Sequence, residues 1–304
     1  MSLRETLKGT GVALVTPLTA KGTIDLEALG RVIDSVISNG VNYVVALGTT
    51  GEAPTLTNPE KLDIIQLTYE KVKNRVPVVI GIGGNDTRDQ VSDLESFPLD
   101  RATAILSASP YYNKPSQEGI FQHYKMLAAS SPKPLILYNV PGRTAKNMTA
   151  DTTIRLANEV DNIAGTKEAS GDMAQCMQIL RDRPEDFLVV SGDDALALPQ
   201  IACGMDGVIS VAANCFPKKF TDMVRLSLRG EFAAAKKIND SLIDGYEILF
   251  AENNPAGVKA FLAEAGLISN YLRLPLTPLS SELHERVKEY YEEYVTSQLK
   301  AVKS

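Results

Sequence analysis

The sequence contains no tryptophan, two histidines and three cysteines among its 304 residues. The cysteines are too few and too widely spaced for a disulfide framework, and no Cys-x-x-Cys pair indicates a zinc site. Two histidines, His123 and His284, exclude a three-histidine metal site within one chain. We therefore expect no metal, and the residue types leave only a carboxylate-rich magnesium site open.

Long apolar segments and an excess of positive charge are also missing. No stretch of about 18 consecutive apolar residues is present, so we expect no membrane span. The first residues include Arg4, Glu5 and Lys8 and lack the apolar core of a signal peptide, which predicts a cytoplasmic protein. With 31 basic and 37 acidic residues, the net charge of -6 predicts no general attraction to nucleic acid or to an anionic membrane. Any anionic ligand must then be held by a local site.

Hydrophobic residues make up 44% of the chain and gather in short runs. Each run is bounded by Gly, Pro, Asn or Ser, as is typical of strands buried on both faces, and intervals of roughly 20 to 35 residues leave room for a helix. The eight runs are 12–15, 43–47, 78–82, 102–106, 135–138, 163–166, 187–190 and 207–211. This alternation, without a linker rich in Gly, Ser or Pro, predicts an α/β fold, a closed (β/α)₈ TIM barrel.

Helix signals fill the intervals between the runs. Residues 25–38 carry apolar side chains at helical spacing. Asn58 followed by Pro59 opens another helix, and Ser116 and Thr149 are typical N-terminal caps. Strand and helix therefore alternate along the first three quarters of the chain.

Beyond residue 229 the pattern is helical only. The expected helices cover residues 232–250, 255–265 and 281–301. We therefore divide the chain into a barrel, residues 1–229, and a C-terminal helical extension, residues 230–304.

The sixth run is the most unusual, because Lys167 follows it directly. The carboxyl ends of barrel strands converge on one mouth, where the active site of this fold lies. A lysine buried there with few compensating charges loses its proton more easily, and the free amine is a nucleophile toward carbonyl carbon. Schiff-base chemistry is therefore the functional hypothesis for Lys167. The alternative is a surface lysine just beyond the strand, paired with Glu168.

Other strand ends also carry polar residues. Thr49 and Thr50 lie between two glycines, where backbone amides and hydroxyls can bind a small carboxylate. The alternative is a tight strand-to-helix turn that uses these residues only for its geometry. Tyr138 and Arg143 offer a proton shuttle and a carboxylate clamp, against the alternative of a core tyrosine and a solvated arginine. The loop 109–115 holds paired tyrosines between prolines, which favours an interface.

Six ordered blocks resemble the dihydrodipicolinate synthase and N-acetylneuraminate lyase family over residues 9–280. The blocks are GTTGE at 48–52, SPYYNKPSQEG at 109–119, YNVPGRT at 138–144, GTKEASG at 165–171, SGDD at 191–194 and GVISVAAN at 207–214. The arginine of YNVPGRT is similar to that of the family's synthases rather than its sugar-acid lyases. The resemblance implies a lyase that joins pyruvate to L-aspartate 4-semialdehyde in diaminopimelate and lysine biosynthesis, with no cofactor.

The resemblance also implies roles for individual residues. Lys167 matches the Schiff-base lysine, and Tyr138 matches the phenol that moves protons. Thr49 and Tyr112 match the partners of that phenol in a proton relay. In the family the second tyrosine enters from the adjoining subunit, so a homodimer or a dimer-of-dimers tetramer is implied. The family's substrate-binding positions are matched by Thr50, Arg143, Gly192 and Ile209.

Synthases of this family are often inhibited by lysine at the subunit interface. The positions that match this effector pocket are Ala53, Asn58, Lys61, Asn85, Asp89 and Tyr111. Asn58 and Lys61 stand where lysine-sensitive relatives commonly have histidines, and the charge of Lys61 repels a cationic effector. We therefore expect weak or absent inhibition by lysine.

Two other functions stay open from the sequence. A lyase acting on N-acetylneuraminate or a keto-deoxy sugar acid shares the lysine and the barrel with the synthases. The second is a barrel that keeps the fold but has lost catalysis and serves as a sensor or scaffold.

Overall fold

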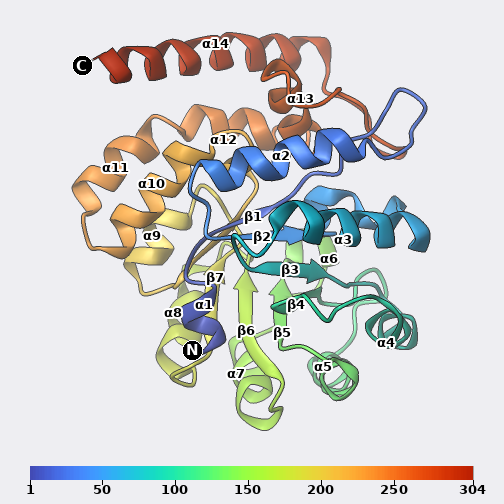
Figure 1. Ribbon diagram of the computed structural model, residues 1–304. Helices are drawn as coiled ribbons and strands as arrows, with labels where there is room; N and C mark the ends of the chain where they lie inside the picture. Colours follow the sequence, from blue (N-terminus) through green and yellow to red (C-terminus); the bar gives the residue numbers. More distant parts are fainter. Residues whose placement is uncertain (304) are drawn as a thin grey trace.

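The computed structural model describes the backbone of residues 1–303 and the side chains of residues 1–296. Parallel strands follow one another around a closed barrel (Figure 1). The barrel closes where β8 pairs with β1. The strands are β1 Gly9–Ala13, β2 Tyr43–Ala46, β3 Val78–Gly81, β4 Ala104–Ala108, β5 Leu135–Asn139, β6 Ile163–Glu168, β7 Leu188–Ser191 and β8 Gly207–Ser210. The predicted (β/α)₈ barrel is confirmed.

Some strand ends differ from the predicted runs. β1 begins at Gly9, three residues before the run at 12–15, because glycines there admit close neighbours that a hydrophobic pattern does not reveal. A Cβ atom on Gly11 would lie 2.2 Å from the ring of Tyr43. β6 extends to Glu168, so Lys167 lies inside the strand rather than beyond it.

Helices cover the outside of the barrel, as the spacing predicts. They are α2 Leu26–Ser38, α3 Asn58–Val72, α4 Thr87–Ser96, α5 Gln117–Ser130, α7 Ala150–Glu159, α8 Met173–Asp182, α9 Ala197–Ala202 and α10 Pro217–Leu228, with the short helices α1 Leu3–Thr6 and α6 Pro141–Thr144. Ser116 and Thr149 accept hydrogen bonds from backbone N–H groups of the first turn, as predicted. For α3 the N-cap is Thr57 rather than Asn58, because Thr57 and Glu60 form a capping box.

The C-terminal extension contains one helix more than predicted. Residues 232–250 form two helices, α11 Phe232–Asp240 and α12 Ile243–Phe250. The Ser241 hydroxyl donates to the carbonyl of Ile238 at 2.7 Å, and the N–H of Leu242 turns back to Asn239. This local hydrogen bonding competes with a continuous helix. α13 Ala256–Glu264 and α14 Ser281–Lys303 follow, with α14 lying across the top in Figure 1.

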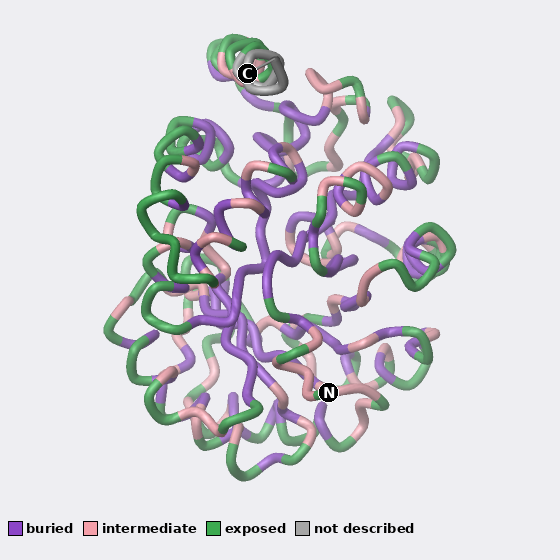
Figure 2. The backbone as a smooth tube through the Cα atoms, turned by 60° about the vertical axis from the view of Figure 1, so that its left-hand side comes forward, coloured by how far each residue is buried: buried purple, intermediate pink, exposed green. Residues whose placement is uncertain are grey.

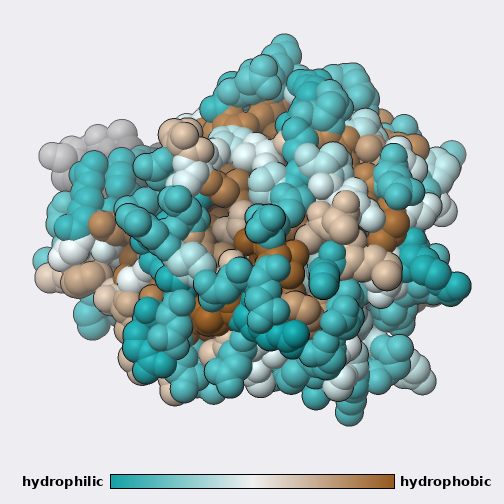
Figure 3. All heavy atoms as spheres, turned by 90° about the horizontal axis from the view of Figure 1, so that it is seen from below, coloured by the Kyte–Doolittle hydropathy of each residue, from teal (hydrophilic) through white to brown (hydrophobic). Residues whose placement is uncertain are grey.

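The core has two layers. One fills the space between strands and helices, and the other fills the barrel interior with inward-facing residues of alternate strand positions. Along the backbone, buried residues gather in the middle of the molecule and exposed residues lie toward the outside (Figure 2). The inner layer includes Tyr43, Val45, Val79, Leu106, Ile136, Leu188, Val190 and Ile209. From below, the surface is mostly hydrophilic, with apolar side chains showing in recesses near its middle (Figure 3). Among the described residues, no helix has both the length and the apolar character needed to cross a membrane.

A buried ion pair fastens the extension to the barrel. The Lys259 ammonium of α13 contacts the Glu52 carboxylate in the turn after β2, and both side chains are almost fully buried. Lys259 also donates to the carbonyl of Tyr271 at 2.9 Å. Burial lowers the pKa of the Lys259 ammonium, and the charge of Glu52 acts in the opposite direction. The division of the chain at residue 229 stays a prediction, but its two parts share this contact.

Replacing Lys259 by methionine is expected to destabilise the fold by about 3–5 kcal/mol, because the Glu52 carboxylate is left buried without its partner. Urea unfolding followed by circular dichroism measures the loss. The control is Lys236→Ala, which removes the exposed pair of Lys236 with Asp240 and should cost less than about 0.5 kcal/mol. Equal stability losses in the two variants would contradict the assignment.

Candidate active site

Lys167 lies in a cavity of about 740 Å³ at the carboxyl ends of the barrel strands. Tyr138 of β5 is its register partner across the sheet. The Lys167 Nζ atom lies 4.3 Å from the centre of the Tyr138 ring. Lys167 is 5% exposed, so the prediction of a buried amine at the barrel mouth is confirmed.

The alternative pairing of Lys167 with Glu168 is wrong. Successive residues of a strand face opposite sides, so Glu168 points outward when Lys167 points into the barrel. Its carboxylate accepts hydrogen bonds from Asn139 Nδ2 at 3.0 and 3.1 Å, from Gln175 Nε2 at 3.1 Å and from the N–H of Ser170 at 2.8 Å. Within the part of the chain whose side chains are described, no carboxylate lies within ion-pair distance of Lys167.

Gly192, just after β7, makes room for the lysine side chain. A Cβ atom at this position would lie 2.9 Å from Lys167 Cε and 2.6 Å from the Cβ of Ala169. Both distances are too short for a real side chain, so packing requires glycine here. No sequence pattern predicted this packing role, because a collision between residues of two strands has no local signature.

The other predicted polar residues reach the same cavity. Thr49 and Thr50 lie in the 3₁₀ turn Thr49–Gly51 after β2, and Arg143 lies in α6 after β5. Thr50 is buried, whereas Arg143 is exposed on the cavity rim. A buried hydroxyl and a rim guanidinium give the cavity two separate donors for anionic groups.

The extension supplies cavity residues that the sequence did not predict. They come from α11, α12 and the loop after α12: Asn239, Ile243, Tyr246, Glu247, Phe250, Asn253 and Asn254. Asn254 Nδ2 donates to the Thr50 hydroxyl at 3.0 Å. The only local sign was a pair of asparagines before Pro255 in a gap between helical segments, which is a turn signal and names no function.

Two predicted residues stand outside the cavity wall. Tyr112 is 86% exposed on the loop after β4, away from Lys167. Its φ of +72° is a left-handed backbone conformation. Ile209 lies in β8 within the inner core layer, beneath the cavity. The structure of a single chain therefore gathers six of the eight residues.

The six residues expected in the effector pocket also come together. Ala53, Asn58, Lys61, Asn85, Asp89 and Tyr111 line a second cavity of about 680 Å³. Its wall includes Thr49, Tyr138 and Arg143, which line the active-site cavity as well. The sequence missed two of its acidic residues, Asp86 and Asp93.

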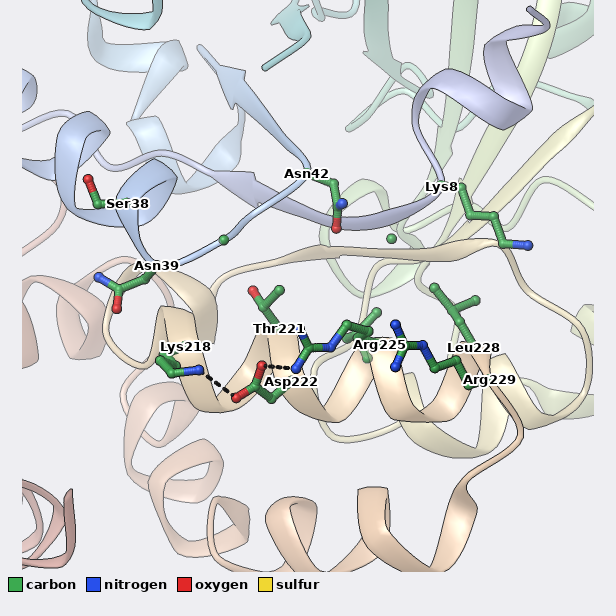
Figure 4. A pocket seen from close by; sticks show the side chains of 13 residues that line it. Lys8, Ser38, Asn39, Asn42, Lys218, Thr221, Asp222, Arg225, Leu228 and Arg229 are labelled. Carbon is green, nitrogen blue, oxygen red and sulfur yellow. Dashed lines mark hydrogen bonds and ion pairs between the residues drawn. The ribbon is translucent and has the colours of Figure 1, made fainter. Parts of the chain in front are cut away.

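A third cavity lies at the other end of the barrel. It is lined by Lys8 before β1, by Asn42 before β2 and by basic residues of α10. Figure 4 shows Lys218 and Arg225 of α10 directed toward Asp222, at 2.9 and 2.8 Å. None of the predicted site residues lies there, in keeping with active sites at the carboxyl ends of barrel strands.

A lysine amine buried beside a tyrosine, in a barrel mouth with two anion donors, defines the class of (β/α)₈ enzymes that attack a carbonyl group through lysine. The comparisons with known proteins give the particular family. Residues 6–294 match the family model described as the dihydrodipicolinate synthetase family. The chain belongs to this family.

Similar proteins cover nearly the whole chain. The 4-hydroxy-tetrahydrodipicolinate synthase of Parabacteroides distasonis is 49% identical over 93% of this chain and 95% of that protein. The crystal structure of dihydrodipicolinate synthase from Aquifex aeolicus has a TM-score of 0.91 and 38% identity, covering 94% of this chain and 98% of that one. A chloride-inhibited dihydrodipicolinate synthase from Acinetobacter baumannii, solved with pyruvate, has a TM-score of 0.91 and 39% identity with the same coverage.

Gly192→Ala is expected to slow covalent trapping of a keto acid at Lys167 by roughly 10- to 100-fold, because a displacement of about 1 Å is enough to misplace the amine. Borohydride trapping with pyruvate, followed by intact mass, measures the rate. The matched variant is Gly142→Ala in the same cavity wall, where an added Cβ meets nothing within 4 Å. If both variants trap pyruvate at the same rate, the packing argument fails.

Proposed function

We propose that this chain is a 4-hydroxy-tetrahydrodipicolinate synthase, which condenses pyruvate with L-aspartate 4-semialdehyde in diaminopimelate and lysine biosynthesis. The observation that carries the proposal is the buried Lys167 amine beside Tyr138, with no carboxylate of the described side chains at ion-pair distance. The names of the similar synthases support the same reaction. A cytoplasmic location stays a prediction.

The reaction begins at the Lys167 amine. Its lone pair adds to the ketone carbon of pyruvate, and loss of water gives an imine to which Tyr138 supplies a proton. The protonated imine nitrogen then accepts electrons when a methyl proton passes to the Tyr138 oxygen, which has just given up its own proton; this produces an enamine without a metal or cofactor. The enamine carbon attacks the aldehyde carbon of the semialdehyde, and the aldehyde oxygen takes that proton from Tyr138 to become a hydroxyl. The amino group of the semialdehyde finally displaces Lys167, and the ring closes.

Each substrate has a carboxylate, and the cavity offers a donor for each. Thr50 is assigned to the carboxylate of pyruvate and Arg143 to that of the semialdehyde, as the resemblance implies. The burial of Thr50 and the rim position of Arg143 support this order, because pyruvate must reach Lys167 first. The close approach of Gly192 to Lys167 supports its assignment beside the keto acid. Ile209 is assigned to the same place, with its backbone rather than its side chain near the keto acid.

Tyr112 is proposed to complete the active site of a second copy of this chain. Its ring is exposed and does not line the cavity of its own chain, which supports a role in trans. The proton relay of Thr49, Tyr138 and Tyr112 then needs at least a homodimer, and a dimer of dimers is the assembly expected from the resemblance. An exposed tyrosine on a loop is also a frequent anchor of protein interfaces.

The test of this function is turnover and trapping in parallel. Wild type should consume pyruvate and aspartate semialdehyde together, and borohydride should place the pyruvate adduct on Lys167. Lys167→Ala should lose both signals, with at least a 10³-fold fall in turnover, since the covalent step has no other nucleophile. Release of pyruvate from N-acetylneuraminate or a keto-deoxy sugar acid, without condensation, would instead favour a lyase. Trapping without any turnover would favour a binding protein.

The second cavity is proposed to correspond to the lysine-effector pocket of the family, with the positive charge of Lys61 added to it. Lys61 lies in it, with its Nζ atom 3.4 Å from Asn58 Oδ1. Burial raises the pKa of the Asp93 carboxyl, while the charge of Lys61 acts in the opposite direction. Lys61 therefore occupies the acidic side of the pocket, where a cationic effector would have to bind.

Wild type is expected to show weak or absent inhibition by lysine, and Lys61→Ala is expected to become at least several-fold more sensitive. The reason is that removal of the fixed ammonium leaves the Asp93 carboxylate without that positive charge, so an external cation can take its place. Initial rates at increasing lysine concentration give both values. Half-inhibition of wild type by sub-millimolar lysine, or unchanged sensitivity in the variant, would contradict the assignment.

A further inference from the structure

Asn254 lies where the C-terminal extension meets the mouth of the barrel. It occupies the loop between α12 and α13, it is 5% exposed, and it belongs to the cavity wall. Its neighbour Asn253 has a φ of +78°, a left-handed conformation that asparagine tolerates better than most residues. This turn directs the chain toward the cavity just before α13 begins.

The loop contacts both groups assigned to substrate carboxylates. Asn254 Nδ2 donates to the Thr50 hydroxyl at 3.0 Å. Arg143 Nη2 donates to the backbone carbonyl of Asn254 at 3.3 Å and to Asn253 Oδ1 at 3.4 Å. Thr50 and Arg143 come from different strand ends of the barrel, so this loop is the element that joins them.

The direction of the hydrogen bond to Thr50 has a chemical consequence. An amide NH₂ group has no acceptor, so the Thr50 oxygen must accept and its own hydrogen stays free. That hydrogen is then available to an anion in the cavity. If Thr50 donated to its neighbour instead, it would present only lone pairs to a carboxylate.

The other end of the amide is unusual. Asn254 Oδ1 is buried and has no hydrogen-bond partner among the described residues. A buried acceptor without a partner is costly, and native structures keep few of them. An asparagine whose two ends are so unequally satisfied is more consistent with a role in orienting Thr50 than with stabilising the loop.

We propose that Asn254 is a positioning residue of the active site, which holds the Thr50 hydroxyl as a donor toward the pyruvate carboxylate and seats the Arg143 guanidinium through its backbone. The inference rests on the proposed function. It assigns the C-terminal extension a part in positioning the two groups proposed to bind substrate, through the side chain and main chain of one residue.

The experiment uses the whole chain and pyruvate alone. The pyruvate concentration that half-saturates borohydride trapping at Lys167 is measured for wild type, Asn254→Ala, Thr50→Val and the double variant. Asn254→Ala should raise it by about tenfold, the effect of losing one hydrogen bond to an anion, while the maximal trapping rate stays within about threefold. In the Thr50→Val background the same substitution should add nothing, because Asn254 acts through the hydroxyl.

A second variant keeps the test independent of folding. Asn254→Asp is nearly isosteric, but its carboxylate accepts the Thr50 hydrogen and repels the bound anion, so half-saturation should rise more than in Asn254→Ala. Asn158→Ala on the exposed face of α7 is the control and should match wild type. Thermal unfolding of each variant shows whether the fold is kept.

The outcomes separate the two proposals. The role of Asn254 is overturned if both Asn254 variants are half-saturated at the same pyruvate concentration as wild type. It is also overturned if Asn254→Ala has its full effect when Thr50 is valine. Either result leaves the proposed function standing. Trapping of pyruvate without condensation of aspartate semialdehyde overturns the proposed function. The half-saturating pyruvate concentrations of the variants still test the role of Asn254 in that case. A wild-type chain that forms no adduct at Lys167 overturns both.

Discussion

The register between β5 and β6 is the constraint on which the site depends. Tyr138 pairs with Lys167 and Asn139 pairs with Glu168, so one pair faces the barrel interior and the other faces the helices. A slip of one residue in β6 would place the carboxylate in the cavity and the amine outside. The hydrogen bonds of Glu168 to Asn139 and Gln175 oppose such a slip, because they require the outward pair to stay in line. The same bonds keep the negative charge directed away from the amine.

The barrel makes the nucleophile, but the extension helps to shape the cavity around it. Helices α11 and α12 contribute both apolar and polar residues to the wall of the cavity. The loop after α12 contacts Thr50 and Arg143. The ion pair between Lys259 and Glu52 fixes α13 to the turn that carries the two threonines. The geometry of the cavity wall thus depends on a contact between segments more than 200 residues apart in the sequence.

Sequence patterns predicted the features that depend on interactions between residues close together in the chain. Apolar runs located the strands, and cap residues such as Ser116 and Thr149 located helix starts, since both depend on neighbouring residues. The lysine that follows the sixth run and the family resemblance predicted the buried amine of the cavity. The early start of β1, the break at Ser241 and the role of Gly192 were not predicted, because each depends on a contact or a hydrogen bond that has no local apolar signature. Asn254 was missed because its partner is in the barrel.

The two cavities at the barrel mouth share a wall, and this has a thermodynamic consequence. Thr49, Tyr138 and Arg143 each line both spaces, so a ligand in the second cavity would contact residues that also line the cavity of Lys167. Coupling between two sites requires only that one ligand changes the free energy of the other, and it acts equally in both directions. A shared tyrosine and a shared arginine are a direct contact through which such coupling can act, without a distant pathway. The charges of Lys61 and Asp93 belong to the second cavity alone, whereas Lys167 lines only the first.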